Sequence, residues 1–410
     1  MTGETASALT PKGRFAPLNR SGFNISDMRE NNRMLALKYI CTSNGVSRIE
    51  LAKLTGLTKM TLTNITNELI QAGLICQEPV GETLSGSVGR KPIMLTIAPD
   101  SPVVAGVWIS RDFCYGVLSD LKANVLAQKR IPLGRFDNAE SLCEKLVRCV
   151  EYLTLQTPRR VIGVGICSLG PVDIDNGVIL KPTNFYGITD VHVAAEISAK
   201  LGLPAFLEKD MNASALAEKY YGRCRDVSDF VYLGITNGIG AGVVSSGELF
   251  HGGSGFSGEF GHTSIDYCGE LCHCGNRGCI ELYASVPNIL RNYYEQFGED
   301  AASLNRLISL ADTDEQAAGY LKGICERIAT ALVNISNVLD PSVIVIGHDG
   351  FYFSDKMLEI IEQKLNRDIL ASGYKRISLC RSAFADCSPL VGAATIVMDK
   401  IFTGRLNILA

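Results

Sequence analysis

The chain has 410 residues, with 39 Lys and Arg against 43 Asp and Glu, and 14 cysteines. This length favours two or three packed units over a single domain. No apolar run approaches the roughly 20 residues of a membrane span, and no signal-peptide pattern opens the chain. We therefore expect a cytoplasmic protein without membrane contact, whose cysteines are free thiols and metal ligands rather than disulfides.

Charge is distributed unevenly along the chain. Residues 1–98 carry 11 basic and 7 acidic side chains, a net charge of +4, whereas the remainder carries 28 basic and 36 acidic side chains, a net charge of −8. A basic segment on an acidic body favours a nucleic-acid reader joined to another function.

The first hundred residues show a flexible arm followed by a helical pattern. Residues 1–30 are rich in Ser, Gly, Asn and Pro, which predicts the arm. Ser47 and Glu50 match a capping box, in which each side chain satisfies a backbone N–H group at a helix start. Helical periodicity and end signals predict three helices, at about 32–43, 48–55 and 59–72.

Two strand candidates follow, at 74–78 and 92–97, with a Gly- and Ser-rich loop between them. Helix, helix-turn-helix and a two-stranded wing predict a winged helix-turn-helix domain over residues 31–98. Its third helix places an apolar stripe opposite a polar face able to reach base edges in a major groove. The candidate DNA-binding residues are Lys59, Thr61, Thr63, Asn64 and Asn67 on this helix, and Arg90 and Lys91 on the wing. The alternative is a small helical domain that binds another protein.

From residue 99 to 410 the pattern alternates between strands and helices. Strand-like runs lie at 103–109, 161–168, 230–235 and 343–346, and the firmest helices lie at 139–153, 191–201, 213–221 and 316–338. Such alternation predicts an α/β domain, here in two halves of similar length.

A histidine and a group of cysteines predict one structural zinc ion per chain. His262 is followed by the run Cys272-His273-Cys274-Gly275-Asn276-Arg277-Gly278-Cys279. Three thiolates and one imidazole complete a tetrahedral zinc site. The predicted ligands are His262, Cys272, Cys274 and Cys279, and Cys268 and His273 are further candidates.

The sequence resembles the ROK family of sugar kinases and repressors. The resemblance rests on Glu259-Phe260-Gly261-His262, the cysteine run ending in Glu281, the glycines between Gly238 and Gly242, and the segment 339–347. It implies an actin-like ATPase fold of two α/β lobes with a sugar between them. Its repressor branch carries an N-terminal winged helix with a Gly-Arg-x-Pro wing, and Gly89-Arg90-Lys91-Pro92 matches that motif.

The resemblance also implies which residues contact the sugar. Glu259, His262 and Glu281 match the positions that bind sugar hydroxyls, and Gly170, Thr183 and Asn184 resemble positions lining the pocket. Asp210 stands where kinases of the family carry the base that deprotonates the sugar, so it is a vestigial base candidate. The preceding position is usually Asn, but here it is Lys209, whose ammonium group is expected to pair with Asp210.

The nucleotide side departs from the family pattern. The family's first phosphate loop reads Asp-x-Gly-Gly-Thr, but the corresponding residues are Trp108-Ile109-Ser110-Arg111-Asp112, and Gly347-His348 replaces a Gly-Gly pair. Because glycines let backbone N–H groups approach phosphates, we expect no ATP binding and no enzyme activity.

We therefore expect a transcription regulator, a repressor of sugar-utilisation genes, that acts as a homodimer or higher homo-oligomer. It would bind a near-palindromic double-stranded DNA operator and respond to a sugar effector. The alternatives are an ATP-dependent sugar kinase with an atypical phosphate loop and a protein-interaction scaffold. An activator role and regulation by a protein partner also stay open.

Overall fold

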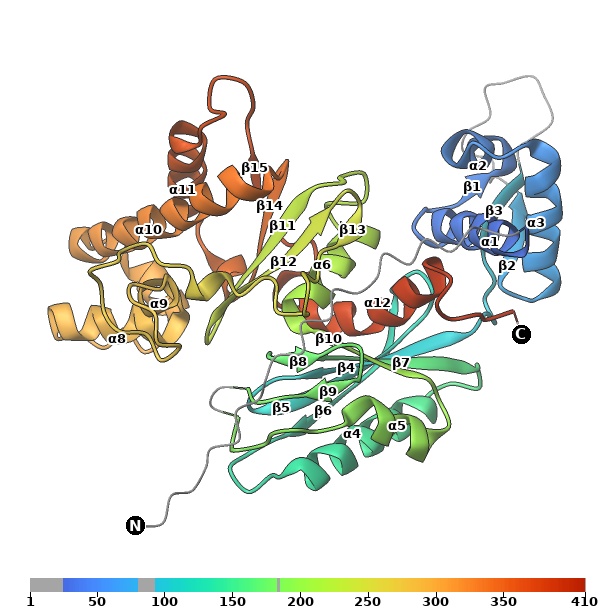
Figure 1. Cartoon of the computed structure of the whole chain (residues 1–410), viewed down its shortest axis with the longest axis horizontal. Helices are drawn as coiled ribbons and strands as arrows, with labels where there is room; N and C mark the ends of the chain where they lie inside the picture. Colours follow the sequence, from blue (N-terminus) through green and yellow to red (C-terminus); the bar gives the residue numbers. More distant parts are fainter. Residues whose placement is uncertain (1–24, 80–92, 183–184, 410) are drawn as a thin grey trace, which may run out of the picture.

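The computed structural model describes residues 25–79, 93–182 and 185–409. These residues form an N-terminal unit (residues 25–97) and two α/β lobes, which we call the first lobe (103–209) and the second lobe (230–381) (Figure 1). Helices α6 (Asp210–Tyr220) and α12 (Ser388–Phe402) pack against each other between these parts. Within the described ranges, no helix is both long and apolar enough to cross a lipid bilayer.

The N-terminal unit packs three helices against a small antiparallel sheet in the order β1-β3-β2. Its elements are α1 (Ile25–Cys41), β1 (Val46–Ser47), α2 (Arg48–Thr55), α3 (Lys59–Gln71), β2 (Ile75–Pro79) and β3 (Ile93–Ile97). The predicted capping box is present, with Glu50 N–H donating to Ser47 Oγ and Ser47 N–H donating to the Glu50 carboxylate. These local signals explain why the observed α2 and α3 match the predicted helices.

Helix α1 begins at Ile25, so residues 25–30 belong to a helix and not to the expected arm, and the predicted helix start near residue 32 was wrong. The rest of the expected arm, residues 1–24, lies outside the described residues. Ion pairs to another helix stabilise the added turns. Arg33 Nη2 lies 3.1 Å from Glu68 Oε2 of α3, and Arg29 pairs with the same carboxylate. Since Glu68 is far along the chain, a local sequence pattern does not reveal this contact.

The first lobe contains a five-stranded sheet in the order β10-β7-β4-β5-β6, with α4 and α5 beside it in Figure 1. Strands β4, β7 and β10 are parallel, and β5 and β6 are antiparallel to their neighbours. The elements are β4 (Val103–Ile109), β5 (Phe113–Ser119), β6 (Val125–Pro132), α4 (Ala139–Thr154), β7 (Val161–Ser168), β8 (Val172–Asp173), β9 (Val178–Ile179), α5 (Val193–Leu201) and β10 (Ala205–Lys209).

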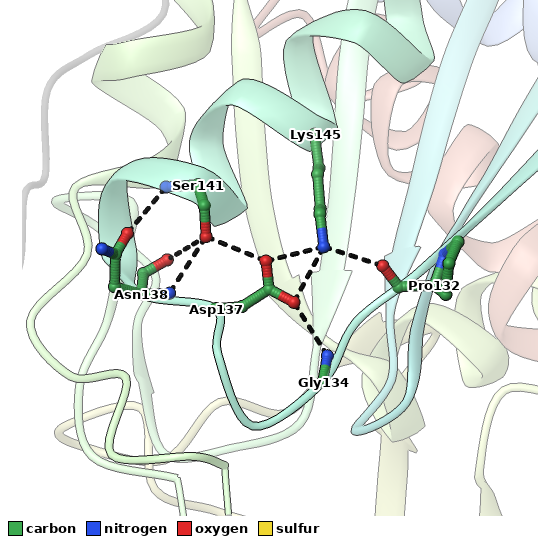
Figure 2. A network of polar contacts seen from close by, with 6 residues as sticks. All are labelled: Pro132, Gly134, Asp137, Asn138, Ser141 and Lys145. Atoms are coloured by element: carbon green, nitrogen blue, oxygen red, sulfur yellow. Dashed lines mark hydrogen bonds and ion pairs between the residues drawn. The ribbon is translucent and has the colours of Figure 1, made fainter.

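A polar network fixes the connection from β6 into α4 (Figure 2). Asp137 accepts hydrogen bonds from Gly134 N–H, Ser141 Oγ and Lys145 Nζ, and Lys145 also donates to the Pro132 carbonyl. Burial alone would raise the pKa of Asp137, but the hydrogen bonds from Lys145, Gly134 and Ser141 outweigh it and lower the pKa. The charged carboxylate therefore stabilises this corner.

The second lobe contains a five-stranded sheet in the order β13-β12-β11-β14-β15. Its elements are β11 (Phe230–Ile235), β12 (Ile239–Ser245), β13 (Glu248–Leu249), η2 (Phe260–His262), α7 (Glu281–Ala284), α8 (Val286–Phe297), α9 (Leu304–Leu310), α10 (Glu315–Leu339), β14 (Val343–His348), η3 (Asp349–Tyr352), α11 (Asp355–Asp368), β15 (Ser378–Arg381) and η4 (Ala385–Cys387). The strands and long helices expected from the α/β pattern are present in both lobes, which confirms a mixed α/β fold.

Helix α12 lies unusually close to its neighbours. A Cβ atom added at Gly165 of β7 would lie 1.9 Å from the Ala393 carbonyl oxygen, and one added at Gly392 would lie 2.4 Å from the Ala213 carbonyl oxygen of α6. No side chain fits at such contacts, so these glycines allow the elements to pack backbone to backbone. Helix α6 begins at Asp210, three residues before its predicted start.

The C-terminal part of α12 also packs on the N-terminal unit (Figure 1). Leu37 and Ile40 of α1 share one buried apolar cluster with Met398 and Ile401 of α12. The N-terminal unit therefore has no separate core, and its position depends on α12.

Candidate effector cavity, metal centre and nucleic-acid interface

A cavity of about 480 Å³ lies between residues of the two lobes and α6. Six of the eight predicted sugar-binding residues line it together, although they are spread over more than a hundred positions of sequence. These residues are Gly170, Lys209, Asp210, Glu259, His262 and Glu281. The other two, Thr183 and Asn184, lie outside the described residues.

Lys209 pairs with a different carboxylate from the one expected. Its Nζ atom lies 3.2 Å from Glu259 Oε1 and also donates to the Ser257 carbonyl. Among the described residues, its ion pair is therefore with Glu259, so the expected pairing with Asp210 was wrong. The two side chains belong to different elements: Lys209 ends β10 and its ammonium group contacts the loop that carries Ser257, whereas Asp210 begins α6.

Asp210 has an unusual protonation equilibrium. Burial raises its pKa to about 7, against the opposing effects of the Met211 N–H hydrogen bond and the Lys209 charge. At neutral pH the side chain is thus divided between its neutral and charged forms. Either form can hydrogen-bond a hydroxyl group, the neutral form as a donor and the charged form as an acceptor.

On the second-lobe side of the cavity, a backbone N–H group holds the carboxylate of Glu281. The carboxylate accepts a hydrogen bond from Ile239 N–H at 3.0 Å. A Cβ atom added at Gly238 would lie 2.7 Å from Glu281 Oε2, and one added at Gly261 would lie 2.3 Å from the Ile239 carbonyl oxygen. The glycine-rich segment between Gly238 and Gly242 therefore makes room for a carboxylate at the cavity wall.

Sequence reasoning missed several residues near the cavity. His251 Nε2 lies 2.7 Å from Glu208 Oε2, and Glu208 also accepts from Asn212 Nδ2 at 2.8 Å. This contact, between a buried carboxylate and a half-buried imidazole, joins the loop after β13 to the end of β10. Arg111, which was considered only as a lost phosphate-loop residue, and Arg291 of α8 line the cavity as well. Isolated polar residues far apart in sequence gave no signal for these roles.

Aromatic side chains lie on the side of the cavity formed by residues 108–112, which were expected to replace a phosphate loop. Trp108 of β4 packs edge-on against Phe113 at 5.1 Å and against His348 of β14 at 6.3 Å between ring centroids. His348 Nδ1 lies 3.1 Å from the Tyr232 hydroxyl, and burial lowers the pKa of His348 to about 4. The two lobes thus meet through neutral rings.

The four predicted zinc ligands converge. The ligand atoms of His262, Cys272, Cys274 and Cys279 all lie within 4.8 Å of one another. Cys274 Sγ and Cys279 Sγ are 3.7 Å apart, and Cys272 Sγ is 3.7 Å from His262 Nδ1. A tetrahedral zinc ion with Zn–S bonds of about 2.3 Å requires sulfur atoms about 3.8 Å apart. The donor set and spacing therefore fit zinc.

His273 also approaches this group, whereas Cys268 is not part of it. His262, His273 and Glu281 form a second group of possible metal ligands that shares His262 with the first. Three thiols and one imidazole suit zinc better than two imidazoles and one carboxylate in a structural site. Burial raises the pKa of Cys279 to about 12, so metal loading would release protons from the site.

The polar face of α3 is exposed as the sequence predicts. Leu62, Ile65 and Leu69 are buried. The opposite face presents Lys59, Thr63, Asn64 and Asn67 as exposed residues and Thr61 as a half-buried one. Arg90 and Lys91 lie outside the described residues.

A groove beside α3 was not anticipated from the sequence. It is lined by α1 residues, among them Met28 and Arg29, and by Met60 and Asn64 of α3. Met60 at the start of α3 is 78 % exposed. An apolar side chain and a guanidinium group thus flank the polar face of α3.

Comparisons with known proteins agree with this architecture. A family model described as "ROK family" matches residues 104–400. The xylose repressor of Caldicellulosiruptor bescii is 28 % identical, over 92 % of this chain and 97 % of its own. Among solved structures, a ROK family transcriptional regulator, described as a homologue of the E. coli MLC protein, superposes with a TM-score of 0.79 at 28 % identity, covering 92 % of this chain and 98 % of its own.

A related kinase covers less of the chain. The ROK hexokinase from Thermus thermophilus superposes with a TM-score of 0.64 at 26 % identity. It covers 72 % of this chain although 97 % of the hexokinase is matched. The regulator therefore shares a part of the chain for which the hexokinase has no counterpart.

Proposed function

The chain belongs to the ROK family, and we propose that it is a DNA-binding transcriptional repressor of sugar-utilisation genes, whose operator affinity is set by a sugar bound between its lobes. The observation that carries this proposal is the coverage of the comparisons: the regulator spans 92 % of the chain and the hexokinase 72 %. The difference favours a regulator over a kinase.

We assign residues 31–98 to a winged helix-turn-helix, which α1 extends back to Ile25. Helix α3 would lie in the major groove, with Lys59, Thr61, Thr63, Asn64 and Asn67 facing DNA. Thr and Asn side chains can read base edges, and Lys59 can contact phosphate. Arg90 and Lys91 are proposed to contact phosphate or the minor groove. A homodimer or higher homo-oligomer presenting two such helices suits a near-palindromic operator in double-stranded DNA.

The sugar would bind in the cavity through Gly170, Thr183, Asn184, Lys209, Asp210, Glu259, His262 and Glu281. Zinc held by His262, Cys272, Cys274 and Cys279 would fix the loop that presents the last two side chains. A bound metal supplies rigidity and no reactive group here, because all four of its positions are taken by protein.

Helix α6 offers a direct route from the cavity to the N-terminal unit. Its first residue, Asp210, lines the cavity, and its last residue, Tyr220, donates a hydrogen bond to Asp399 of α12 at 2.8 Å. Lys38 of α1 lies over the Tyr220 ring at 5.5 Å. Helix α6 has 11 residues, a length of about 16 Å at 1.5 Å per residue, and it therefore spans from the cavity to the residue that contacts α1.

Buried polar contacts join α6 to the segment that leads into α12. Glu218 of α6 is fully buried and accepts hydrogen bonds from Ser382 Oγ at 2.6 Å and Ala383 N–H at 2.8 Å. These residues precede α12. A sugar that binds two lobe arrangements unequally would shift α6 and α12, and with them the spacing of the two α3 helices.

The test is a salt-dependent mobility-shift titration of the purified full chain on its own promoter region, with and without a panel of monosaccharides. We expect specific binding that one sugar releases, with no ATP turnover. Asn64→Ala should weaken operator binding about tenfold or more, while Lys356→Ala on the exposed face of α11 should not. Absence of specific DNA binding, or turnover of ATP with a sugar, would contradict the proposal.

A further inference from the structure

Lys209 places a positive charge inside the proposed effector site. Its side chain is only 7 % exposed, and its Nζ atom donates to the Ser257 carbonyl and to Glu259 Oε1. An ammonium group has three donors and no acceptor. A ligand group that meets Lys209 must therefore accept hydrogen bonds, whereas the Asn expected from the family resemblance could both donate and accept.

The carboxylates around the cavity already have partners. Glu259 pairs with Lys209, Glu281 accepts from Ile239 N–H, and Asp210 accepts from Met211 N–H. Arg111 and Arg291 line the same cavity. In the part of the chain that the structure describes, Arg111 has no ion pair, and Arg291 has only Glu295, at 3.7 Å and on the exposed side of α8. Each carboxylate keeps further acceptor sites, and the two arginines add positive charge that no carboxylate of the cavity pairs with among the described residues.

The ammonium of Lys209 has one donor left for a ligand. Two of its three N–H donors meet Ser257 and Glu259, so the third is available to a ligand acceptor. A ligand oxyanion would accept it in a charge-assisted hydrogen bond, which is stronger than the bond that a neutral hydroxyl oxygen would accept. Glu259 has further acceptor sites, so it can stay paired with Lys209 and still accept hydroxyl groups of the same ligand.

We propose that Lys209 is a specificity-determining residue, which selects an effector that carries an oxyanion on its sugar, a carboxylate or a phosphate, over the corresponding neutral sugar. This inference rests on the proposed function, because it concerns the ligand of the same cavity. Arg111 supplies a second positive charge on the first-lobe side of that cavity.

Isothermal titration calorimetry on the purified full chain tests the selection with matched ligands. The sets are glucose, glucuronate and glucose 6-phosphate; xylose and xylonate; and N-acetylglucosamine and its 6-phosphate. We expect one anionic member to bind at least about tenfold more tightly than its neutral partner, as charge-assisted hydrogen bonds require. The carboxylate and phosphate arms distinguish the two sources of the oxyanion.

Lys209→Gln is the decisive variant, because glutamine removes the positive charge while it keeps a polar side chain with hydrogen-bond donors, only one atom shorter than lysine. It should reduce the anion preference about tenfold, and Lys356→Gln on the surface of α11 should leave it intact. Thermal unfolding of both variants checks that they fold. The proposal is overturned if no anionic ligand binds, if the neutral partner binds as tightly, or if the preference survives in Lys209→Gln.

Operator binding by the ligand-free protein separates this inference from the proposed function. Specific operator binding together with preference for neutral sugars would refute only the role of Lys209. Anion binding without operator binding would refute only the repressor function.

Discussion

The two sides of the cavity between the lobes have opposite characters. On the effector side, Glu259, Glu281 and Asp210 surround open space, and glycines make room for them. On the opposite side, the rings of Trp108 and His348 pack edge to face and line the cavity where the sequence departs from the expected phosphate loop. Under the proposed function, the comparison teaches that one scaffold can keep the side chains that bind a sugar while it loses the loop that would bind a nucleotide.

The cysteine-rich loop supports the side of the cavity that is proposed to bind the effector. Cys274→Ser should therefore have the largest effect on zinc content and on sugar binding. Loss of one thiolate should lower zinc content from about one ion per chain toward zero, as measured by plasma mass spectrometry. Sugar binding should fall with it, because His262 and Glu281 lose their support. Cys268→Ser is the matched control, and equal zinc loss in that variant would show that the ligand set is wrong.

The opposite side of the cavity should be stabilised by the packing of its aromatic side chains and not by a metal ion. Trp108→Ala should lower the free energy of unfolding by about 2–4 kcal/mol, measured by urea titration with circular dichroism. Phe136→Ala is the control, because Phe136 is 88 % exposed and its loss should cost under about 0.5 kcal/mol. If Trp108→Ala gained ATP turnover, Trp108 would only block a nucleotide site that is still functional, and the prediction that this site has been lost would be wrong.

The charged form of Asp210 should destabilise the folded protein, because its carboxyl group is buried beside the cavity. Its pKa of about 7 lies above the ordinary value of 3.8, so the folded state favours the proton. Wild-type stability should therefore fall relative to Asp210→Asn as pH rises from about 4 through 7, and the difference should level off above that. Denaturant titrations at several pH values between 4 and 8 measure this difference.

Asp137 of the first lobe should give the opposite sign. Its pKa is lowered from 3.8 by hydrogen bonds that outweigh burial, so its charged form stabilises the folded state. Asp137→Asn should be less stable than the wild type at neutral pH, and the gap should close as pH falls through the lowered pKa. Matching pH profiles for the two variants would contradict both assignments.

Tyr232→Phe should have the smallest effect, because it removes one hydrogen bond to His348 and keeps the ring. We expect a loss of about 0.5–1.5 kcal/mol in the free energy of unfolding, with sugar binding unchanged in calorimetry. Altered sugar binding would mean that the two sides are not independent.

Local signals predicted the fold well, and distant contacts limited the prediction. The capping box at Ser47 and Glu50 and the apolar runs of β4 and β7 depend on neighbouring residues, so the sequence reveals them. The first turns of α1 depend on Glu68, 39 residues away from Arg29, and were missed. The two-residue strand β1 is too short to produce a pattern.

The candidate site was predicted unevenly for the same reason. Motif residues converge on one cavity because the ends of β7 and β10, the turn η2 and the start of α7 meet there, and the cysteine run encloses its own metal site. The partner of Lys209 depends on how the loop after β13 folds back, since Ser257 is 48 positions away. The contact between His251 and Glu208 has the same origin.

The apolar cluster shared by α1 and α12 has a consequence for protein engineering. A chimaera cut near residue 98, which would exchange operator specificity between regulators, would separate Leu37 and Ile40 from Met398 and Ile401. The transplanted N-terminal unit would contact an α12 surface that does not match it, and apolar side chains on both sides of this interface would be exposed. A graft that carries the matching residues of α12 along with the reader would keep both its stability and its response to the effector.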